Sequence, residues 1–328
     1  MAQPHLVAPS VDRRHFLVGS GLVASAALAH TQLTATPLVA APPADSSAKA
    51  LSGPKFRYCL NTSTINGGMV PIRQQIRIAA EAGYDAIEPW LRDIEKFVME
   101  GGAIRDLAKE LSDLGLGVDS AIAFGNWIVD DAARRTAGLE QCKRDMEIVS
   151  QLGGQWLAAP PAGATQPPKL NLDAAAERYR QLLELGEQCG VTPQIELWGF
   201  SHNLSTLAEV LYVAAAADHP RACLLLDVYH LYKGGSNFQN LGLVPGRQLH
   251  CLHMNDYPDN PPRADIADKD RVYPGDGVAP IGKILQTLVD GGFAGTLSLE
   301  LFNRSYWEQP PAEVARIGLE KMKAVSGG

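Results

Sequence analysis

From residue 55 onward, short apolar and β-branched runs alternate with longer stretches in which apolar residues recur every three or four positions. Such alternation is typical of parallel βα units. The pattern predicts strands near residues 56–61, 84–89, 117–122, 155–159, 192–197, 222–227, 248–254 and 296–301. It predicts helices near residues 71–82, 104–114, 131–152, 172–189, 204–217, 237–241 (short), 281–290 and 311–324.

Eight repeats of this kind predict a single-domain α/β fold, the (β/α)8 or TIM barrel, over residues 55–328. Glycines follow several predicted helices at positions where a left-handed cap is favourable. A doubly wound sheet is less favoured, because no GxGxxG turn follows any predicted strand.

The N-terminal segment does not share this alternation. Arg13-Arg14 precedes Phe16-Leu17 and a mild apolar run over 18–28, which resembles a twin-arginine signal peptide spanning residues 1–29. The alternatives are an ordinary Sec signal or a chance arginine pair. We expect export by the twin-arginine machinery to the periplasm or outside the cell. We expect no permanent membrane anchor, because the run is shorter than the roughly 20 residues that span a bilayer. Residues 30–54, rich in Ala, Pro, Thr and Ser, predict a flexible linker.

Composition narrows the classes of partner. The chain of 328 residues is 46% hydrophobic and has a net charge of −7 without a Lys/Arg-rich run, which argues against nucleic acid as a partner. The five cysteines show no CxxC pairing and are interpreted as core thiols rather than metal ligands. The sequence leaves the oligomeric state open, a homo-oligomer included.

Four side chains suited to metal binding stand at the C-terminal ends of the last four predicted strands. They are Glu196, Asp227, His253 and Glu300. A polar strand end that faces water is the ordinary alternative for each of them singly. Adjacent strands of a barrel converge at one rim, however, so together they predict a site for one divalent ion. Three oxygen donors and one imidazole suit Mn²⁺, Mg²⁺ or Co²⁺, with Zn²⁺ as an alternative.

Such an ion would polarise the carbonyl of a sugar and acidify the neighbouring C–H bond. Glu196 and Glu300 flank the set and are predicted to be the acid/base pair. We expect four further residues to contact the substrate, namely Glu88, Trp198, His230 and Arg271. A capping histidine, an exposed loop arginine and packed tryptophans, Trp90 and Trp127 included, are the structural alternatives. The long polar segment 257–274 predicts a lid or substrate-shaping loop.

Several of these segments resemble one family. GYDAIEPW, IELWG, LLLDVYHLY, LHMND, RVYPGDG and LSLELF are similar to the xylose isomerase-like barrel superfamily, over about residue 55 to the C-terminus. The resemblance implies that Glu196, Asp227, His253 and Glu300 hold one divalent ion, often manganese. It also implies that His230 and Arg271 contact substrate and that the two glutamates exchange a proton. The segment 257–270 departs from the pattern, and the small number of histidines disfavours the endonuclease branch.

These observations together predict a metal-dependent isomerase or epimerase acting on a small-molecule keto-sugar or related polyol ketone. A lyase or dehydratase acting on a keto-sugar, an inosose or a 3-keto-glycoside is the first alternative, because both reactions begin by removing a proton next to a carbonyl. A non-catalytic carbohydrate-binding barrel is the second. The sequence does not identify the sugar.

Overall fold

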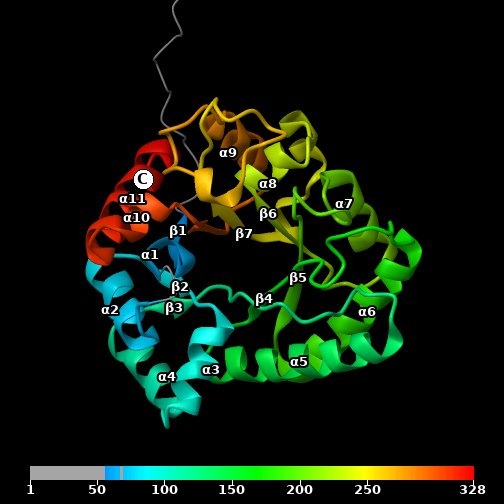
Figure 1. Ribbon diagram of the computed structural model, residues 1–328, viewed down its shortest axis with the longest axis horizontal. Helices are drawn as coiled ribbons and strands as arrows, with labels where there is room; N and C mark the ends of the chain where they lie inside the picture. The colour runs from blue at the N-terminus through cyan, green and yellow to red at the C-terminus, as the bar shows by residue number, and fades with distance from the viewer. Residues whose placement is uncertain (1–55, 67–68) are drawn as a thin grey trace, which may run out of the picture. The chain divides into compact units, whose positions relative to one another are not determined.

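The computed structural model describes residues 56–66 and 69–328, so the predicted signal peptide and linker lie outside the described residues. Eight parallel strands form one curled sheet in the order β3-β2-β1-β8-β7-β6-β5-β4, with helices around it (Figure 1). The strands are β1 (Arg57–Asn61), β2 (Ala86–Glu88), β3 (Gly117–Val118), β4 (Trp156–Ala159), β5 (Thr192–Glu196), β6 (Leu224–Asp227), β7 (Leu249–Met254) and β8 (Thr296–Leu299). All eight predicted strands are confirmed, and so is the predicted barrel class.

The helices connect successive strands on the outside of the sheet (Figure 1). Their bounds are α1 (Ser63–Asn66), α2 (Ile72–Ala82), α3 (Leu91–Met99), α4 (Ile104–Asp113), α5 (Ala132–Gln151), α6 (Leu172–Cys189), α7 (Leu207–Ala216), α8 (Val228–Lys233), α9 (Ile281–Asp290), α10 (Arg304–Trp307) and α11 (Pro311–Ser326). Left-handed glycine caps end two of the predicted helices, at Gly83 (φ 89°) after α2 and at Gly190 (φ 72°) after α6.

The sheet is open between its two edge strands, β3 and β4. The predicted strand 117–122 forms a ladder only at Gly117–Val118. Asp119 accepts hydrogen bonds from Arg57 and from Thr296, which belong to the starts of β1 and β8. The amide of Ala158 still donates to the Ala121 carbonyl at 2.9 Å, so this segment bridges the gap between the two edge strands.

Four helices near the strand ends were not predicted, namely α1, α3, α8 and α10. The short helix α3 occupies part of the loop after β2. The helix α8 begins on the last residue of β6, where the Asp227 carboxylate accepts from the His230 amide at 2.7 Å. The apolar run that forms β6 continues through α8, so hydrophobicity alone shows no boundary there. The predicted short helix at 237–241 is a 3-10 helix over Phe238–Leu243.

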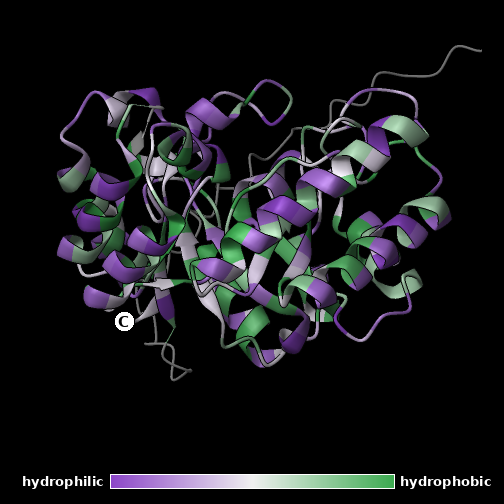
Figure 2. Cartoon of the chain, turned by 90° about the horizontal axis from the view of Figure 1, so that it is seen from below, coloured by the Kyte–Doolittle hydropathy of each residue, from purple (hydrophilic) through white to green (hydrophobic). Residues whose placement is uncertain are grey.

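Buried apolar residues of the strands and of the helices around them form one large core cluster. Hydrophobic and hydrophilic segments alternate along the helices in Figure 2. All five cysteines are free thiols and four are buried, which confirms that they are not paired. Within the described residues, no helix has the length and apolar character needed to cross a membrane.

Candidate active site

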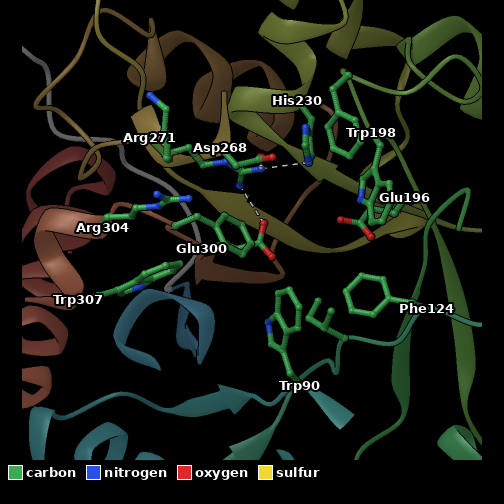
Figure 3. A pocket seen from close by; sticks show the side chains of 14 residues that line it. Trp90, Phe124, Glu196, Trp198, His230, Asp268, Arg271, Glu300, Arg304 and Trp307 are labelled. Atoms are coloured by element: carbon green, nitrogen blue, oxygen red, sulfur yellow. Dashed lines mark hydrogen bonds and ion pairs between the residues drawn. The ribbon is translucent and has the colours of Figure 1, made fainter. Parts of the chain in front are cut away.

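A cavity of about 340 Å³ opens at the C-terminal ends of the strands. Its polar lining includes Glu196, His230, Arg271 and Glu300, which come from β5, α8, the loop after β7 and the residue after β8 (Figure 3). In a β/α barrel this face is where catalytic side chains gather. The cavity therefore coincides with the position predicted for the chemistry.

His253 is the centre of the polar cluster at the cavity floor. Ladder pairing sets Asp227 beside His253, and His253 beside Ser298. The His253 Nδ1 atom lies 3.1 Å from Glu300 Oε2, 3.8 Å from Asp227 Oδ2 and 3.9 Å from Glu196 Oε1. The Nδ1 atom is buried and forms no hydrogen bond, although three carboxylates lie around it.

The four predicted ligands are not equally close together. One donor atom each from Asp227, His253 and Glu300 lies within 4.8 Å of the others. Glu196 lies next to this group, with its Oε1 atom 3.9 Å from His253 Nδ1. The structure thus brings all four residues to one place but sets Glu196 slightly apart.

Glu88 was predicted to contact substrate, but it is fully buried and does not line the cavity. Its carboxylate lies behind the histidine, 3.1 Å from His253 Nε2, and accepts from Asn61 Nδ2 at 2.9 Å and from Ser298 Oγ at 2.6 Å. The last residue of a strand can face either side of the sheet, and here the pleat turns it inward. Glu88 therefore fixes the ring of His253.

Arg271 crosses the cavity floor in spite of the inserted segment before it. Its Nη1 atom donates to Asp227 Oδ2 and to Glu300 Oε2, each at 2.9 Å. Its Nη2 atom donates to Asp268 Oδ1 at 2.6 Å and faces His230 Nε2 at 3.0 Å. A buried guanidinium in this position offsets the negative charge of the carboxylates.

The segment after β7 shapes one side of the cavity, since Asp268 and Lys269 line it. Asp256 holds the end of this segment next to its beginning, because it pairs with Val272 through backbone hydrogen bonds. The Asp256 carboxylate also accepts from the amides of Gly275, Gly277 and Ala279 at 2.9–3.1 Å. These contacts explain how Arg271 returns to the site after a long polar loop.

Two asparagines complete the cluster and were missed by the sequence analysis. Asn255 Nδ2 donates to Asp227 Oδ2 at 2.8 Å. Asn61 Nδ2 donates to Glu88 and also to Glu300 Oε1 at 3.1 Å. Asn61 ends β1 and Asn255 follows β7, so their positions at strand ends could have indicated in the sequence that they belong to the site. Amide side chains are common in loops, which is why they did not stand out.

The two glutamates that face the cavity differ in acidity. Burial raises the pKa of Glu196 to about 8, and the Glu300 charge adds to this while His253 opposes it. Burial acts in the same sense on Glu300, but the charge of His253, together with that of Arg271, outweighs it and lowers the pKa. Burial likewise disfavours the charged form of His253, yet Glu300 and Glu88 raise its pKa well above the ordinary value. Burial lowers the pKa of His230 to about 4.

The predicted tryptophan wall is present in part. Trp90 and Trp198 line the cavity (Figure 3), whereas Trp127 is packed in the core against Tyr179 and donates to the Pro160 carbonyl. The Trp198 indole N–H interacts with the Glu196 carboxylate. Packing is therefore the correct interpretation of Trp127.

The fold and the site together define a class of protein: a parallel β/α barrel with carboxylates and imidazoles at its mouth. Residues 76–325 match the family described as xylose isomerase-like TIM barrel. The chain belongs to that family, as the sequence motifs implied.

Individual relatives are distant and differ in activity. The chain is 26% identical to an inosose isomerase of Bacillus velezensis over 82% of this chain and 97% of the relative. It is 24% identical to a 3-dehydroshikimate dehydratase of Pseudomonas aeruginosa over 76% of this chain and 39% of the relative. Among solved structures, the IolI protein with a bound zinc atom is similar with a TM-score of 0.76 and 22% identity, covering 83% of this chain and 98% of that one.

Proposed function

We propose that this protein is a divalent-metal-dependent isomerase or epimerase that acts on a keto-sugar or related polyol ketone. The observation that carries the proposal is that the carboxylates of Glu196, Asp227 and Glu300 gather around the buried Nδ1 atom of His253 at the barrel mouth. Relatives that span nearly the same length include an isomerase of an inosose, which is a polyol ketone.

The residues present fit an ion. The His253 Nδ1 atom is buried without a hydrogen bond and points at carboxylate oxygens, which is the arrangement expected of a metal-ligand set. Glu88 holds the opposite ring nitrogen, as carboxylates commonly do behind a metal-binding histidine. Asp227, His253 and Glu300 would hold the ion, with Glu196 completing the set. Oxygen donors in excess and the absence of a thiolate favour Mn²⁺ or a similarly hard ion.

A bound ion would supply polarisation of the substrate carbonyl. Glu300, whose pKa is lowered, is ionised and is the base that removes the proton next to that carbonyl. Glu196, whose pKa is raised, keeps its proton and is the acid that returns one to the substrate. His230 and Arg271 line the cavity and orient the substrate oxygens.

A dehydratase is the second candidate, and the match to a 3-dehydroshikimate dehydratase favours it. It would use the same first step, removal of a proton next to a carbonyl, followed by loss of a hydroxide from the neighbouring carbon. Product analysis separates the two reactions, because only the dehydratase releases water and leaves a double bond.

The test begins with elemental analysis of the purified chain and a panel of ketoses and inososes assayed with and without chelator. We expect a stoichiometric divalent ion, turnover lost on chelation, and exchange of the substrate C–H proton in deuterated water. Glu300→Gln should bind substrate but abolish exchange, whereas Glu313→Gln, an exposed position on α11, should retain it. Sugar binding without turnover by a metal-free, folded chain would instead indicate a carbohydrate-binding barrel.

We also propose that residues 1–29 direct twin-arginine export of this barrel to the periplasm or beyond. The support is the Arg13-Arg14 pair before a mild apolar run. Replacing both arginines with lysine should retain the chain in the cytoplasm with its signal uncleaved. Export that persists in this variant, through the Sec pathway, would refute the proposal.

A further inference from the structure

One wall of the cavity is built almost entirely of aromatic rings. Phe302, Trp90, Phe124, Trp198 and Phe200, called here the aromatic arc, follow one another with ring centroids 5.9, 5.1, 6.0 and 5.2 Å apart. The rings come from the loops after β2, β3, β5 and β8, and they lie around the mouth in Figure 3 where labelled. Four loops distant in sequence therefore contribute to one continuous apolar surface.

The arc leaves apolar surface open to solvent. Phe124 is 43% exposed and Phe200 is 47% exposed. Three aromatic residues rank among the exposed large hydrophobic side chains of the described chain, and these are two of them, the third being Tyr212. Exposed apolar surface gathered inside a concave site is characteristic of a ligand contact rather than of ordinary packing.

The arc also has little to offer a hydroxyl group. The Trp90 indole N–H donates to Asn61 Oδ1 at 2.9 Å, and the Trp198 indole N–H interacts with Glu196, so both are already used. The phenylalanines have no polar atoms in their side chains. A second sugar ring needs partners for its hydroxyls, because polar groups buried without hydrogen bonds lose binding energy. A flat apolar group needs none.

Resting on the proposed function, we propose that the substrate is a sugar conjugate whose aglycone is an aromatic ring. The sugar lies on the polar floor near Glu300, and the aryl group stacks within the arc at Phe124 and Phe200. A cavity of about 340 Å³ fits this assignment, since pockets of ~300–1,000 Å³ hold ligands of drug size and a lone hexose is smaller than these.

The test compares methyl and phenyl 3-keto-glycosides of the same sugars, in both anomers, by calorimetric binding to the metal-loaded full-length chain. We expect at least one phenyl glycoside to bind roughly tenfold more tightly than its methyl counterpart, the order expected for burying and stacking one ring. Phe124→Ala and Phe200→Ala should each reduce this ratio, and the double variant should bring it near one. Phe124→Tyr should preserve it, because the ring remains.

Leu243→Ala is the matched control, since Leu243 is an exposed apolar side chain (69%) away from the cavity lining and its loss should leave the ratio unchanged. Equal binding within every pair, a ratio that survives the double variant, or no glycoside binding at all would overturn the proposal. A disaccharide that gains as much as the phenyl glycoside would overturn it in favour of a second sugar ring. Proton exchange on the methyl 3-keto-glycosides, which keep a carbonyl but lack the aryl group, tests the proposed function separately, so either idea can fail alone.

Discussion

Glu88 offers the sharpest test of the proposed metal centre, because it touches neither the cavity nor the solvent. Its carboxylate bonds to His253 Nε2, Asn61 and Ser298, and it is fully buried. Glu88→Gln keeps the shape and an acceptor for the imidazole N–H but removes the negative charge behind the ring. Loss of such a partner weakens metal binding by ~10–100-fold, and the retained acceptor places this variant near the lower end.

Glu88→Ala should be worse on two counts. It removes the acceptor as well, so metal binding should weaken by roughly 100-fold, about 2.7 kcal/mol. It also leaves the donors of Asn61, Ser298 and His253 without a partner, and truncation of a buried charged pair costs about 3–5 kcal/mol of folding stability.

The measurement is competition with a chelating dye for the dissociation constant of Mn²⁺ and Zn²⁺, with denaturant unfolding of the metal-free protein alongside. Glu313→Gln is the control for a lost negative charge on the surface. An unchanged dissociation constant in both Glu88 variants would mean that the ion, if bound, does not use His253, and the proposed ligand set would be wrong.

Three further outcomes follow from the same structure. The pKa of Glu196 is about 8 in the folded protein and 4.5 ordinarily, so the folded state binds more protons than the unfolded state between these values. The stability of the metal-free protein should therefore fall as the pH rises from about 4.5 to 8. A flat profile of stability against pH, measured by chemical denaturation, would contradict this. Arg271→Met should lower the free energy of unfolding of the metal-free protein by about 3–5 kcal/mol, because it leaves the Asp227 carboxylate without its buried cation. Added divalent ion should restore part of this stability. A loss under about 1 kcal/mol would refute the argument that Arg271 balances the buried negative charge. Tyr179→Phe should cost about 1–3 kcal/mol by urea unfolding, since its hydroxyl accepts from the Cys223 amide and its single proton is shared between two buried carbonyl oxygens. Unchanged stability would show that these groups find other partners.

Much of the site was accessible from the sequence, because strand ends can be located from hydrophobic runs. The runs ending near Glu196, Asp227, His253 and Glu300 placed these side chains at one rim once a barrel was inferred. The relation is local and periodic: an apolar run of strand length buries its backbone, and its polar last residue marks where burial ends.

Other features depended on which way each side chain turns. Glu88 looked like a rim residue, yet it lies behind His253, because the facing of a strand's last residue is set by the pleat and by register with its neighbours. The separation of Glu196 from the three-residue cluster has the same origin. Trp127 shares its residue type with Trp90 but belongs to the core.

The sequence by itself determined the order of strands and helices, the class of fold and the residue types at the barrel mouth. Tertiary structure alone decided that Arg271 neutralises Asp227 and Glu300, and that rings from four loops form one arc. The physical reason is that hydrophobic periodicity is a property of neighbouring residues. Convergence of loops and compensation of buried charge depend on contacts between residues far apart in the chain, which no local pattern encodes.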